Sequence, residues 1–497
     1  MPGSPGRPEP AAGPTGLHLI EESVVRVDDR QLELAASRRE ADAQLVVRSA
    51  RAEDLAGFDG EASSHQGGYL LVGPRSPRNV AQLRALLSWL APRPLGLQRS
   101  FGFGDRLGLA TPGHVRALRA ARPGLGAIFA QQSIREMART RRSAQQVIDD
   151  ASWGVFCSGW RHIHGADADH VKTGEDVETC AAAGYTLFTF DPGDHVRAEA
   201  DHLVGAELWR ALAELPWTDL EDSPRSMLGR YRRVKPELKD LGIAAGPEQA
   251  ARAAVKYGRA VAHAARLYRR LCEVAPADRE VEISVDETES PTTHFQHVYV
   301  ATELARLGLQ WVSLAPRFVG RFEKGSDYIG DPAAFEADCA LHARIASRLG
   351  PYKLSLHSGS DKLSIYGAFY RGTGSLGHVK TAGTSYLEAL RTLARTAPGL
   401  FREVYQLSRA RYGGDRATYH VSARVGATPD AEGMADAALP GLLDDFHIRQ
   451  VLHVTFGSVL DRLGERLHVA LSRDLPAYED DLERHFVRHL RAFESSA

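Results

Sequence analysis

From about residue 97 onward, the sequence repeats one pattern: a short apolar or alternating run that ends in polar residues, followed by a helical stretch. Runs of this kind lie at 106–110, 126–133, 153–169, 185–191, 281–288, 311–318, 352–358 and 377–382, and a ninth lies at 418–423. Helical patterns at 112–121, 134–151, 293–307, 332–349 and 384–397 separate several of them. Strands alternating with helices predict a parallel sheet with right-handed crossovers. About eight repeats favour closure into a TIM-type (β/α)8 barrel over an open sheet.

The rest of the chain is predicted to surround this barrel. The first 16 residues, MPGSPGRPEPAAGPTG, lack an apolar core, which indicates a disordered tail and not a signal peptide. Short apolar runs and one helical pattern at 79–90 predict a small α/β N-terminal domain over 17–95. The barrel domain is expected at 96–430 with a helical insertion at 194–280, and a C-terminal helical segment at 431–497 is expected to pack on the barrel.

Composition limits the classes of partner. The hydrophobic fraction of 43% and charged fraction of 25% are typical of a globular protein. A formal net charge of -2 argues against general affinity for nucleic acid or anionic membranes, and no apolar run approaches the roughly 18 residues of a spanning helix. Four cysteines without paired spacing favour a reducing cytoplasm and argue against a cysteine-based zinc site. Oligomeric state stays open.

The segment GADADHVKT at 165–173 concentrates chemistry. In an extended strand, Asp167 and Asp169 share one face, the two alanines share the other, and His170 follows at the strand end. Charged side chains on one face and small ones on the other predict a functional site. The alternative is a solvated turn rich in aspartate.

A second carboxylate is expected inside the barrel. In VEISVDE at 281–287, a period of two points Glu282, Ser284 and Asp286 toward the barrel interior. A buried carboxylate must be paired, metal-bound or protonated. Glu282 is therefore either a general acid with a raised pKa or half of a structural salt bridge.

Histidines and cations also follow several predicted strands, where a barrel places its chemistry. His170, His357 and His378, with Glu323 from a loop, form a ligand set suited to a divalent ion with an open position. The cations Lys172, Arg317, Lys362 and Lys380 are candidates for binding a carboxylate or phosphate.

Eight segments together resemble the tagaturonate epimerase family. They are SFGFGDRLGLATPGHV (100–115), IFAQQSIREM (128–137), GADADHVK (165–172), SVDETESPT (284–292), RFVGRFEKGSDYIGD (317–331), KLSLHSGSDK (353–362), HVKTAGTSYLEALR (378–391) and VLHVTFGSVL (451–460). The resemblance implies a divalent-metal-dependent epimerase that interconverts tagaturonate and fructuronate. The ion, such as Zn²⁺, Mn²⁺ or Ni²⁺, is not identified.

The resemblance also implies residue roles. Asp169 would be the proton acceptor, Glu282 the proton donor, and His170 and His357 metal ligands, with Glu323 or His378 as a third ligand. The residues expected to bind the ketouronate substrate are Gln132, Lys172, Asp286, Arg317 and Lys380.

Inverting C4 of a ketouronate poses a chemical problem, because this carbinol is not next to the ketone and enolisation cannot invert it. A retro-aldol cleavage beside the carbinol avoids this problem, since a divalent ion stabilises the resulting enediolate. Direct removal of the carbinol hydrogen lacks an electron sink. Two other functions stay open: a metal-dependent aldolase or epimerase of neutral ketoses, and a sugar-acid-binding protein without catalysis.

Overall fold

Eight parallel strands close into a barrel in the computed structural model, which describes residues 18–27, 32–39, 42–122, 124–233, 236–243, 246–275, 277 and 279–493. Around the barrel the order is β10-β11-β12-β13-β14-β7-β8-β9. The strands are β7 (Ser100–Phe103), β8 (Gly126–Ser133), β9 (His164–Val171), β10 (Leu187–Phe190), β11 (Glu280–Val285), β12 (Ser313–Pro316), β13 (Lys353–Leu356) and β14 (Gly377–Thr381). The predicted (β/α)8 barrel is confirmed, whereas the predicted tail at 1–16 lies outside the described residues.

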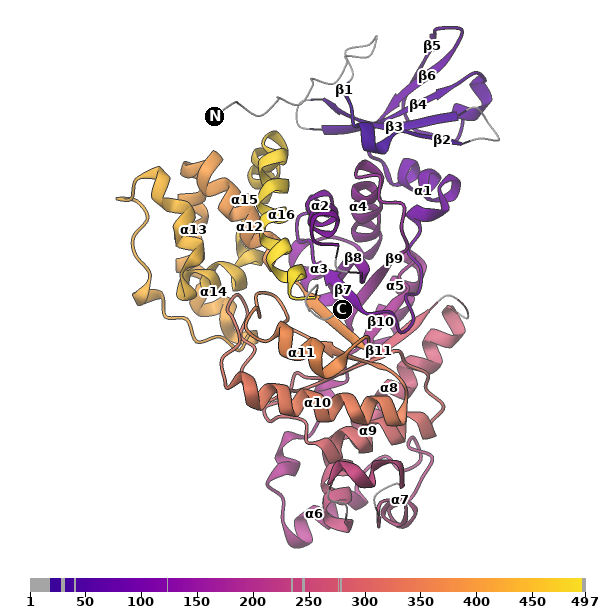
Figure 1. Cartoon of the computed structure of the whole chain (residues 1–497), viewed down its shortest axis with the longest axis vertical. Helices are drawn as coiled ribbons and strands as arrows, with labels where there is room; N and C mark the ends of the chain where they lie inside the picture. The colour runs from indigo at the N-terminus through magenta and orange to yellow at the C-terminus, as the bar shows by residue number, and fades with distance from the viewer. Residues whose placement is uncertain are drawn as a thin grey trace.

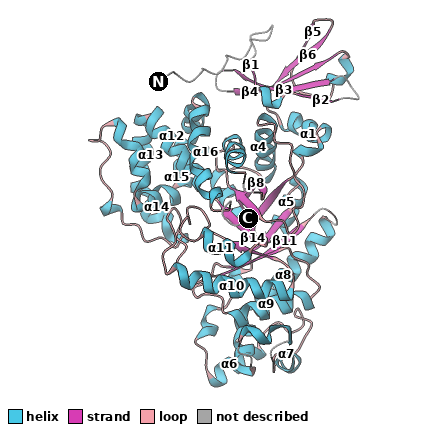
Figure 2. Ribbon diagram, in the orientation of Figure 1, coloured by secondary structure: helices cyan, strands magenta, loops and turns pink. Residues whose placement is uncertain are grey.

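Helices surround the strands, as Figure 2 shows. They include α2 (Thr111–Ala121), α3 (Ile134–Thr140), α4 (Ala144–Cys157), α5 (Gly174–Ala183), α9 (His294–Arg306), α10 (Pro332–Leu349), α11 (Tyr366–Thr373) and α12 (Thr384–Thr396). Local sequence fixes several helix starts: Ser143, Thr173 and Thr293 each cap a helix through a reciprocal capping box. These caps satisfy backbone N–H groups where the chain turns from the rim into the outer layer.

Three sequence predictions of strands are wrong. Residues 106–110 form a loop whose backbone N–H groups bond the Asp105 carboxylate at 2.8–3.0 Å, and the first barrel strand lies earlier, at Ser100–Phe103. The run at 153–157 is the last part of helix α4. It was predicted as a strand because periodicity cannot separate a buried helix from a buried strand. Residues 418–423 form no strand and instead contribute to the rim cavity described below.

The N-terminal region is an antiparallel sheet followed by a helix. Its strands are β1 (His18–Leu19), β2 (Val25–Val27), β3 (Leu32–Arg39), β4 (Asp42–Ser49), β5 (Glu61–His65) and β6 (Gly68–Gly73). They run in the order β1-β3-β4-β6-β5, with β2 on β3, and α1 (Pro77–Leu86) follows. Leu34, Leu45 and Val47 alternate toward one face and join the hydrophobic core of the barrel domain. In Figure 1 this sheet lies at the top, above α4.

Two further groups of helices complete the molecule. Between β10 and β11 lie α6 (Gly205–Ala213), α7 (Pro224–Arg230) and the long α8 (Pro247–Val274), and at the C-terminus lie α13 (Pro398–Asp415), α14 (Phe446–Val454), α15 (Phe456–Arg473) and α16 (Leu475–Arg491). Helix α16 packs on α2 and α12, so the chain end is part of the barrel's outer layer (Figure 1).

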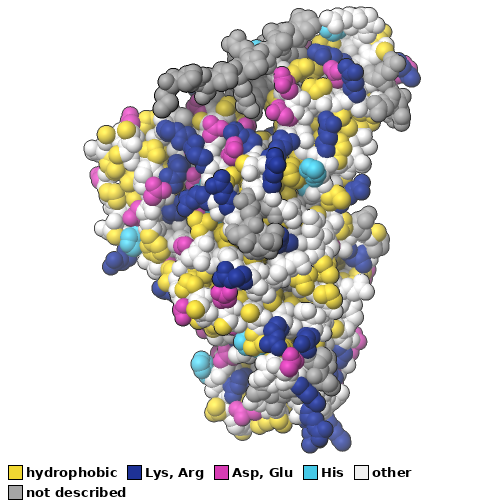
Figure 3. Space-filling model, in the orientation of Figure 1, with side chains coloured by type: hydrophobic (Ala, Val, Ile, Leu, Met, Phe, Trp, Pro, Cys, Tyr) yellow, Lys and Arg dark blue, Asp and Glu magenta, His cyan; other side chains and the backbone are white. Residues whose placement is uncertain are grey.

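The molecular surface carries mixed charge. Lys and Arg side chains are interspersed with Asp and Glu over the face drawn in Figure 3. Among the described residues, no helix has the length and apolar character needed to cross a bilayer. The mixture of positive and negative side chains on the surface agrees with the near-neutral net charge of the sequence.

Candidate active site

A cavity of about 490 Å³ opens at the ends of the barrel strands. Polar side chains from several neighbouring strands and the loops after them line it. The set includes Gln131, Asp169, His170, Asp286, Glu287, Arg317, His357 and Lys380. Because these residues end successive parallel strands, the barrel brings them together from distant positions in the sequence.

A β-bulge in β9 directs two adjacent side chains into this cavity. The pairing of β9 with β10 slips by one residue between Ala168 and Val171, and His170 has a φ of 57°. In a regular strand, Asp169 and His170 would point to opposite faces. The bulge lets both line the cavity.

Lys380 holds three carboxylates together beneath the cavity. Its Nζ lies 2.7 Å from Asp167, 2.9 Å from Asp169 and 2.8 Å from Glu282. Burial alone would lower the pKa of Lys380, but these carboxylates hold that pKa well above its usual range. Asp169 and Glu282, the predicted proton acceptor and donor, therefore share one ammonium group.

The surroundings of Glu282 distinguish between the two alternatives that the sequence left open for this residue. Burial alone would raise the pKa of this fully buried carboxyl, but Lys380 and His357 hold it well below its usual range. Of the two alternatives for Glu282, the salt bridge agrees with this environment, and a general acid with a raised pKa does not. The charged partner comes from β14, far along the chain, so no local pattern reveals it. Glu282 does not line the cavity, and it contacts His357 Nε2 at 2.7 Å.

His357 and His170 lie side by side, with ring centroids 5.2 Å apart. His357 Nδ1 lies 3.0 Å from Asp286 Oδ1, and His170 Nδ1 lies 2.8 Å from Asp169 Oδ1. Both Nδ1 atoms are buried, yet neither is oriented for a hydrogen bond. Asp169, His170 and His357 each offer a ligand atom within 4.8 Å of the others.

The charge of this group fits a divalent ion. Although burial opposes it, Asp169 raises the pKa of His170 to about 9, and Asp286 raises that of His357 to about 10. The cluster thus concentrates negative charge that is neutralised either by two imidazolium protons or by a bound cation. Two imidazoles with carboxylates form a donor set typical of Zn²⁺, Mn²⁺ or Ni²⁺.

Neither residue predicted as a third ligand lies in this group. Glu323 lines the cavity, but its Oε2 accepts hydrogen bonds from the Ser422 hydroxyl at 2.7 Å and the Gln450 amide at 2.8 Å. His378 is fully buried inside the barrel, where its Nδ1 bonds the Ser100 hydroxyl at 2.9 Å. Asp169 and Asp286 are instead the carboxylates that lie next to the Nδ1 atoms of the two imidazoles.

Some of the residues predicted to bind substrate line the cavity and others do not. Asp286, Arg317 and Lys380 line the cavity, whereas Gln132 and Lys172 do not. Lys172 Nζ instead donates to Asp194 at 3.0 Å and lies 3.4 Å from Asp191.

Gln131, and not the predicted Gln132, lines the cavity. A register shift in β8 pairs Gln131 with Asp167, so Gln131 faces the interior and Gln132 turns toward Glu136 at 3.3 Å. Both amide atoms of Gln131 are buried without a partner beside the cavity.

Loop residues that were not predicted also line the cavity. Arg135, Lys324, Tyr419 and Ser422 line the cavity, and the last two come from the segment expected to be a strand. The only local signal for Arg135 is its place just after β8, at the start of α3.

A barrel with imidazoles, carboxylates and an ammonium group around a cavity at its strand ends has the architecture of a barrel enzyme. A family model described as tagaturonate epimerase matches residues 20–493. The tagaturonate/fructuronate epimerase of Thermotoga maritima is 42% identical over 482 residues, which cover 96% of this chain and 97% of that relative.

Solved structures agree with this match. A glycerol-complexed crystal structure of fructuronate-tagaturonate epimerase from Cohnella laeviribosi superposes with a TM-score of 0.88 at 33% identity, covering 97% of each chain. The native crystal structure of that enzyme gives 0.87 at 33% identity, covering 96% of each chain. The chain belongs to the tagaturonate epimerase family and is an isomerase acting on carbohydrates.

Proposed function

We propose that this protein interconverts D-tagaturonate and D-fructuronate by inverting C4 within the rim cavity, with a divalent cation bound there. The observation that carries this proposal is the linked cluster of Asp169, Lys380 and Glu282 beside the paired imidazoles. The family membership supplies the substrate, and the cluster supplies groups that move a proton next to a candidate cation site. A cytoplasmic location, inferred from the scattered cysteines, accompanies the proposal.

Arg317 is proposed to bind the substrate carboxylate. Its guanidinium lines the cavity, and its buried Nε has no hydrogen-bond partner. The backbone around it is fixed, because Arg317 N–H donates to the Thr292 hydroxyl at 3.0 Å and Thr292 N–H donates to the Arg317 carbonyl at 2.8 Å. A guanidinium with an unpaired Nε on a fixed backbone suits recognition of a planar carboxylate.

His170 and His357 are proposed to hold the cation, with Asp169 and Asp286 as the nearby carboxylates. Glu282 accepts the Nε2–H of His357, which leaves Nδ1 to face the cation, an arrangement common in metal sites. When bound, a divalent ion supplies Lewis-acid stabilisation of negative oxygen on the substrate.

The proton path is proposed to run through Lys380. Asp169 lines the cavity and accepts the proton of the C4 hydroxyl, while Lys380, at 2.9 Å, stabilises the charge and relays the proton. Glu282 lies on the far side of the same ammonium, at 2.8 Å. Because Lys380 and His357 keep Glu282 ionised, Glu282 holds the Lys380 ammonium in position for the proton relay and makes no direct contact with the sugar.

For the bond changes we propose a retro-aldol route. Loss of the C4 hydroxyl proton breaks the C3–C4 bond, and its electron pair passes to C3 and the ketone oxygen as an enediolate. The other fragment is a three-carbon aldehyde that carries the carboxylate. Rotation of this aldehyde before C3 attacks its opposite face inverts C4, and the proton then returns to O4.

Isotope exchange and trapping test the route. The retro-aldol route predicts that trapping with an aldehyde reagent during turnover yields the three-carbon carboxylate fragment, with no solvent deuterium at C4. Deuterium at C4 without trapped fragments contradicts it. An aldolase of neutral ketoses, the alternative, predicts turnover of D-tagatose at a rate similar to that of tagaturonate.

A further inference from the structure

A second group of metal-binding side chains lies outside the rim cavity, between helices α9 and α10. These helices contact each other (Figure 1). His294 is the first residue of α9, and Asp338 and His342 are one turn apart on α10. All three offer ligand atoms within 4.8 Å of one another, and none of them lines the rim cavity.

The spacing of these atoms suits a tetrahedral ion. Asp338 Oδ1 lies 3.1 Å from His294 Nε2 and 3.7 Å from His342 Nε2. Two ligands bonded at about 2.0–2.1 Å with tetrahedral angles lie roughly 3.3 Å apart. The observed separations bracket this value, so an ion fits with small side-chain shifts.

Both imidazoles leave Nε2 without a hydrogen bond, although both atoms are buried. His342 is fully buried, so its Nε2 has no access to solvent. A buried acceptor without a partner is costly unless something binds it. The side chain of His294 is 30% exposed, which gives an ion a path from solvent.

The other nitrogen of His342 is already held by the protein. His342 Nδ1 lies 2.9 Å from His297 Nδ1, and His297 Nε2 lies 2.8 Å from the Tyr352 hydroxyl. When His342 donates from Nδ1, its Nε2 keeps a free lone pair for a metal. Such a contact on the remote nitrogen orients metal-binding histidines.

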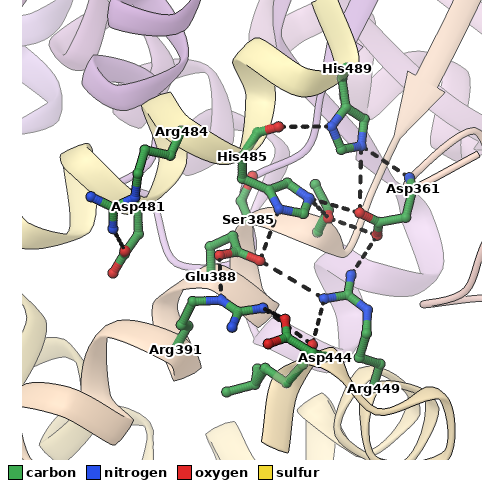
Figure 4. A network of polar contacts seen from close by, with 12 residues as sticks. Asp361, Ser385, Glu388, Arg391, Asp444, Arg449, Asp481, Arg484, His485 and His489 are labelled. Atoms are coloured by element: carbon green, nitrogen blue, oxygen red, sulfur yellow. Dashed lines mark hydrogen bonds and ion pairs between the residues drawn. The ribbon is translucent and has the colours of Figure 1, made fainter. Parts of the chain in front are cut away.

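A third cluster of histidine and aspartate side chains differs from this group because its hydrogen-bonding atoms are paired within the protein. Asp361 Oδ1 bonds His485 Nε2 at 2.7 Å, and Asp361 N–H donates to His489 Nε2 at 3.0 Å (Figure 4). His485 Nδ1 in turn approaches Glu388 at 3.1 Å, and Arg449 bonds Asp361 at 2.8 Å. Each facing nitrogen there has a protein partner, so that cluster is a structural network and not a cation site.

We propose that His294, Asp338 and His342 bind a second divalent cation, of the kind that takes nitrogen and oxygen ligands in tetrahedral geometry, such as Zn²⁺. Water completes the coordination on the side of His294. This site is structural, because it lies between two helices outside the barrel and away from the cavity.

The cation would brace the loop that carries Arg317. Asp338 would bind the ion through Oδ1. Its other oxygen, Oδ2, accepts the N–H of Val319 at 3.2 Å. The ring of Phe318 packs edge-on against His342, with centroids 5.7 Å apart at 84°. Fixing Asp338 and His342 therefore fixes the two residues that follow Arg317.

Metal counting on the full-length protein tests this proposal. Protein stripped with chelator is reloaded with Zn²⁺, freed of excess by gel filtration, and assayed for bound zinc by mass spectrometry. We expect two ions per chain in the wild type and one in His294→Ala and in Asp338→Asn. The surface variant His202→Ala, at an exposed histidine, keeps two.

A variant of the rim cavity separates this site from the proposed function. His170→Asn is expected to keep one ion, and Zn²⁺ is expected to raise its Tm, whereas the double variant His170→Asn/His294→Ala shows neither effect. Equal zinc content in the wild type, His294→Ala and Asp338→Asn, with folding verified by circular dichroism, overturns the second site. That result does not bear on the proposed cation site in the rim cavity, because the zinc lost in His170→Asn measures that site independently.

Discussion

Replacing Arg317 tests how the cavity distinguishes a uronate from a neutral sugar. Arg317→Gln removes the guanidinium whose Nε is buried without a partner and keeps a side chain of similar length. A hydrogen bond to a charged group contributes about 1.5–3 kcal/mol, which corresponds to a loss of roughly 10- to 150-fold in kcat/KM for tagaturonate. Arg317→Lys keeps the charge but not the paired donors, so we expect an intermediate loss.

The assay compares kcat/KM for tagaturonate with that for D-tagatose, which lacks the carboxylate. We expect Arg317→Gln to lower the first value and to change the second by less than about 3-fold, because a neutral sugar makes no ion pair there. The control is Arg344→Gln, an exposed arginine of α10 that pairs with Asp240 at 2.9 Å. Equal losses for both substrates, or no loss for tagaturonate, would refute the assignment of Arg317.

Three further predictions concern the cluster, the bulge and the C-terminal network. Lys380→Met leaves three carboxylates uncompensated, so kcat falls by about 10²- to 10⁴-fold and urea unfolding shows a loss of about 3–5 kcal/mol; wild-type turnover would contradict the relay. His170→Asn retains a residue that tolerates the left-handed backbone, so Tm changes little while activity falls at least about 10²-fold; His170→Val, which does not tolerate it, also lowers Tm. Asp361→Asn removes a buried carboxylate whose pKa is held well below its usual range, although burial opposes this, chiefly by Arg449 and His485. Its stabilising contribution is present above the unfolded pKa of about 3.9 and disappears as pH falls through the folded value. Urea unfolding should therefore show a deficit of about 3–5 kcal/mol at pH 7 that shrinks below pH 4; a deficit independent of pH would refute the charge argument.

The barrel was predictable because most of its strands carry their signal locally, although β7 was missed. GADADHVK shows alternation and a polar end, and β11, β13 and β14 were found from the same pattern. The run at 153–157 misled because a fully buried helix is apolar on all sides, as a central strand is. Flanking turn signals do not separate the two cases there.

The site was only partly predictable because two backbone irregularities change which side chains face inward. The shifts in β8 and β9 exchange Gln132 for Gln131 and add His170 to the face of Asp169. No residue type in either strand requires a bulge, so a regular period of two cannot show which of Gln131 and Gln132 faces the cavity. The direction of the pKa shift of Glu282 could not be predicted for another reason. It depends on the ion pair with Lys380, which forms only once the barrel closes.

The central claim is that the rim cavity epimerises a ketouronate with the help of a divalent ion. The most direct measurement incubates chelator-stripped protein with D-tagaturonate, with and without Mn²⁺, Ni²⁺ or Zn²⁺, and follows D-fructuronate by chromatography, with His357→Ala as the matched variant. The account predicts conversion that returns on adding metal and is lost in His357→Ala. Undiminished conversion by the stripped protein, or by His357→Ala, would contradict it.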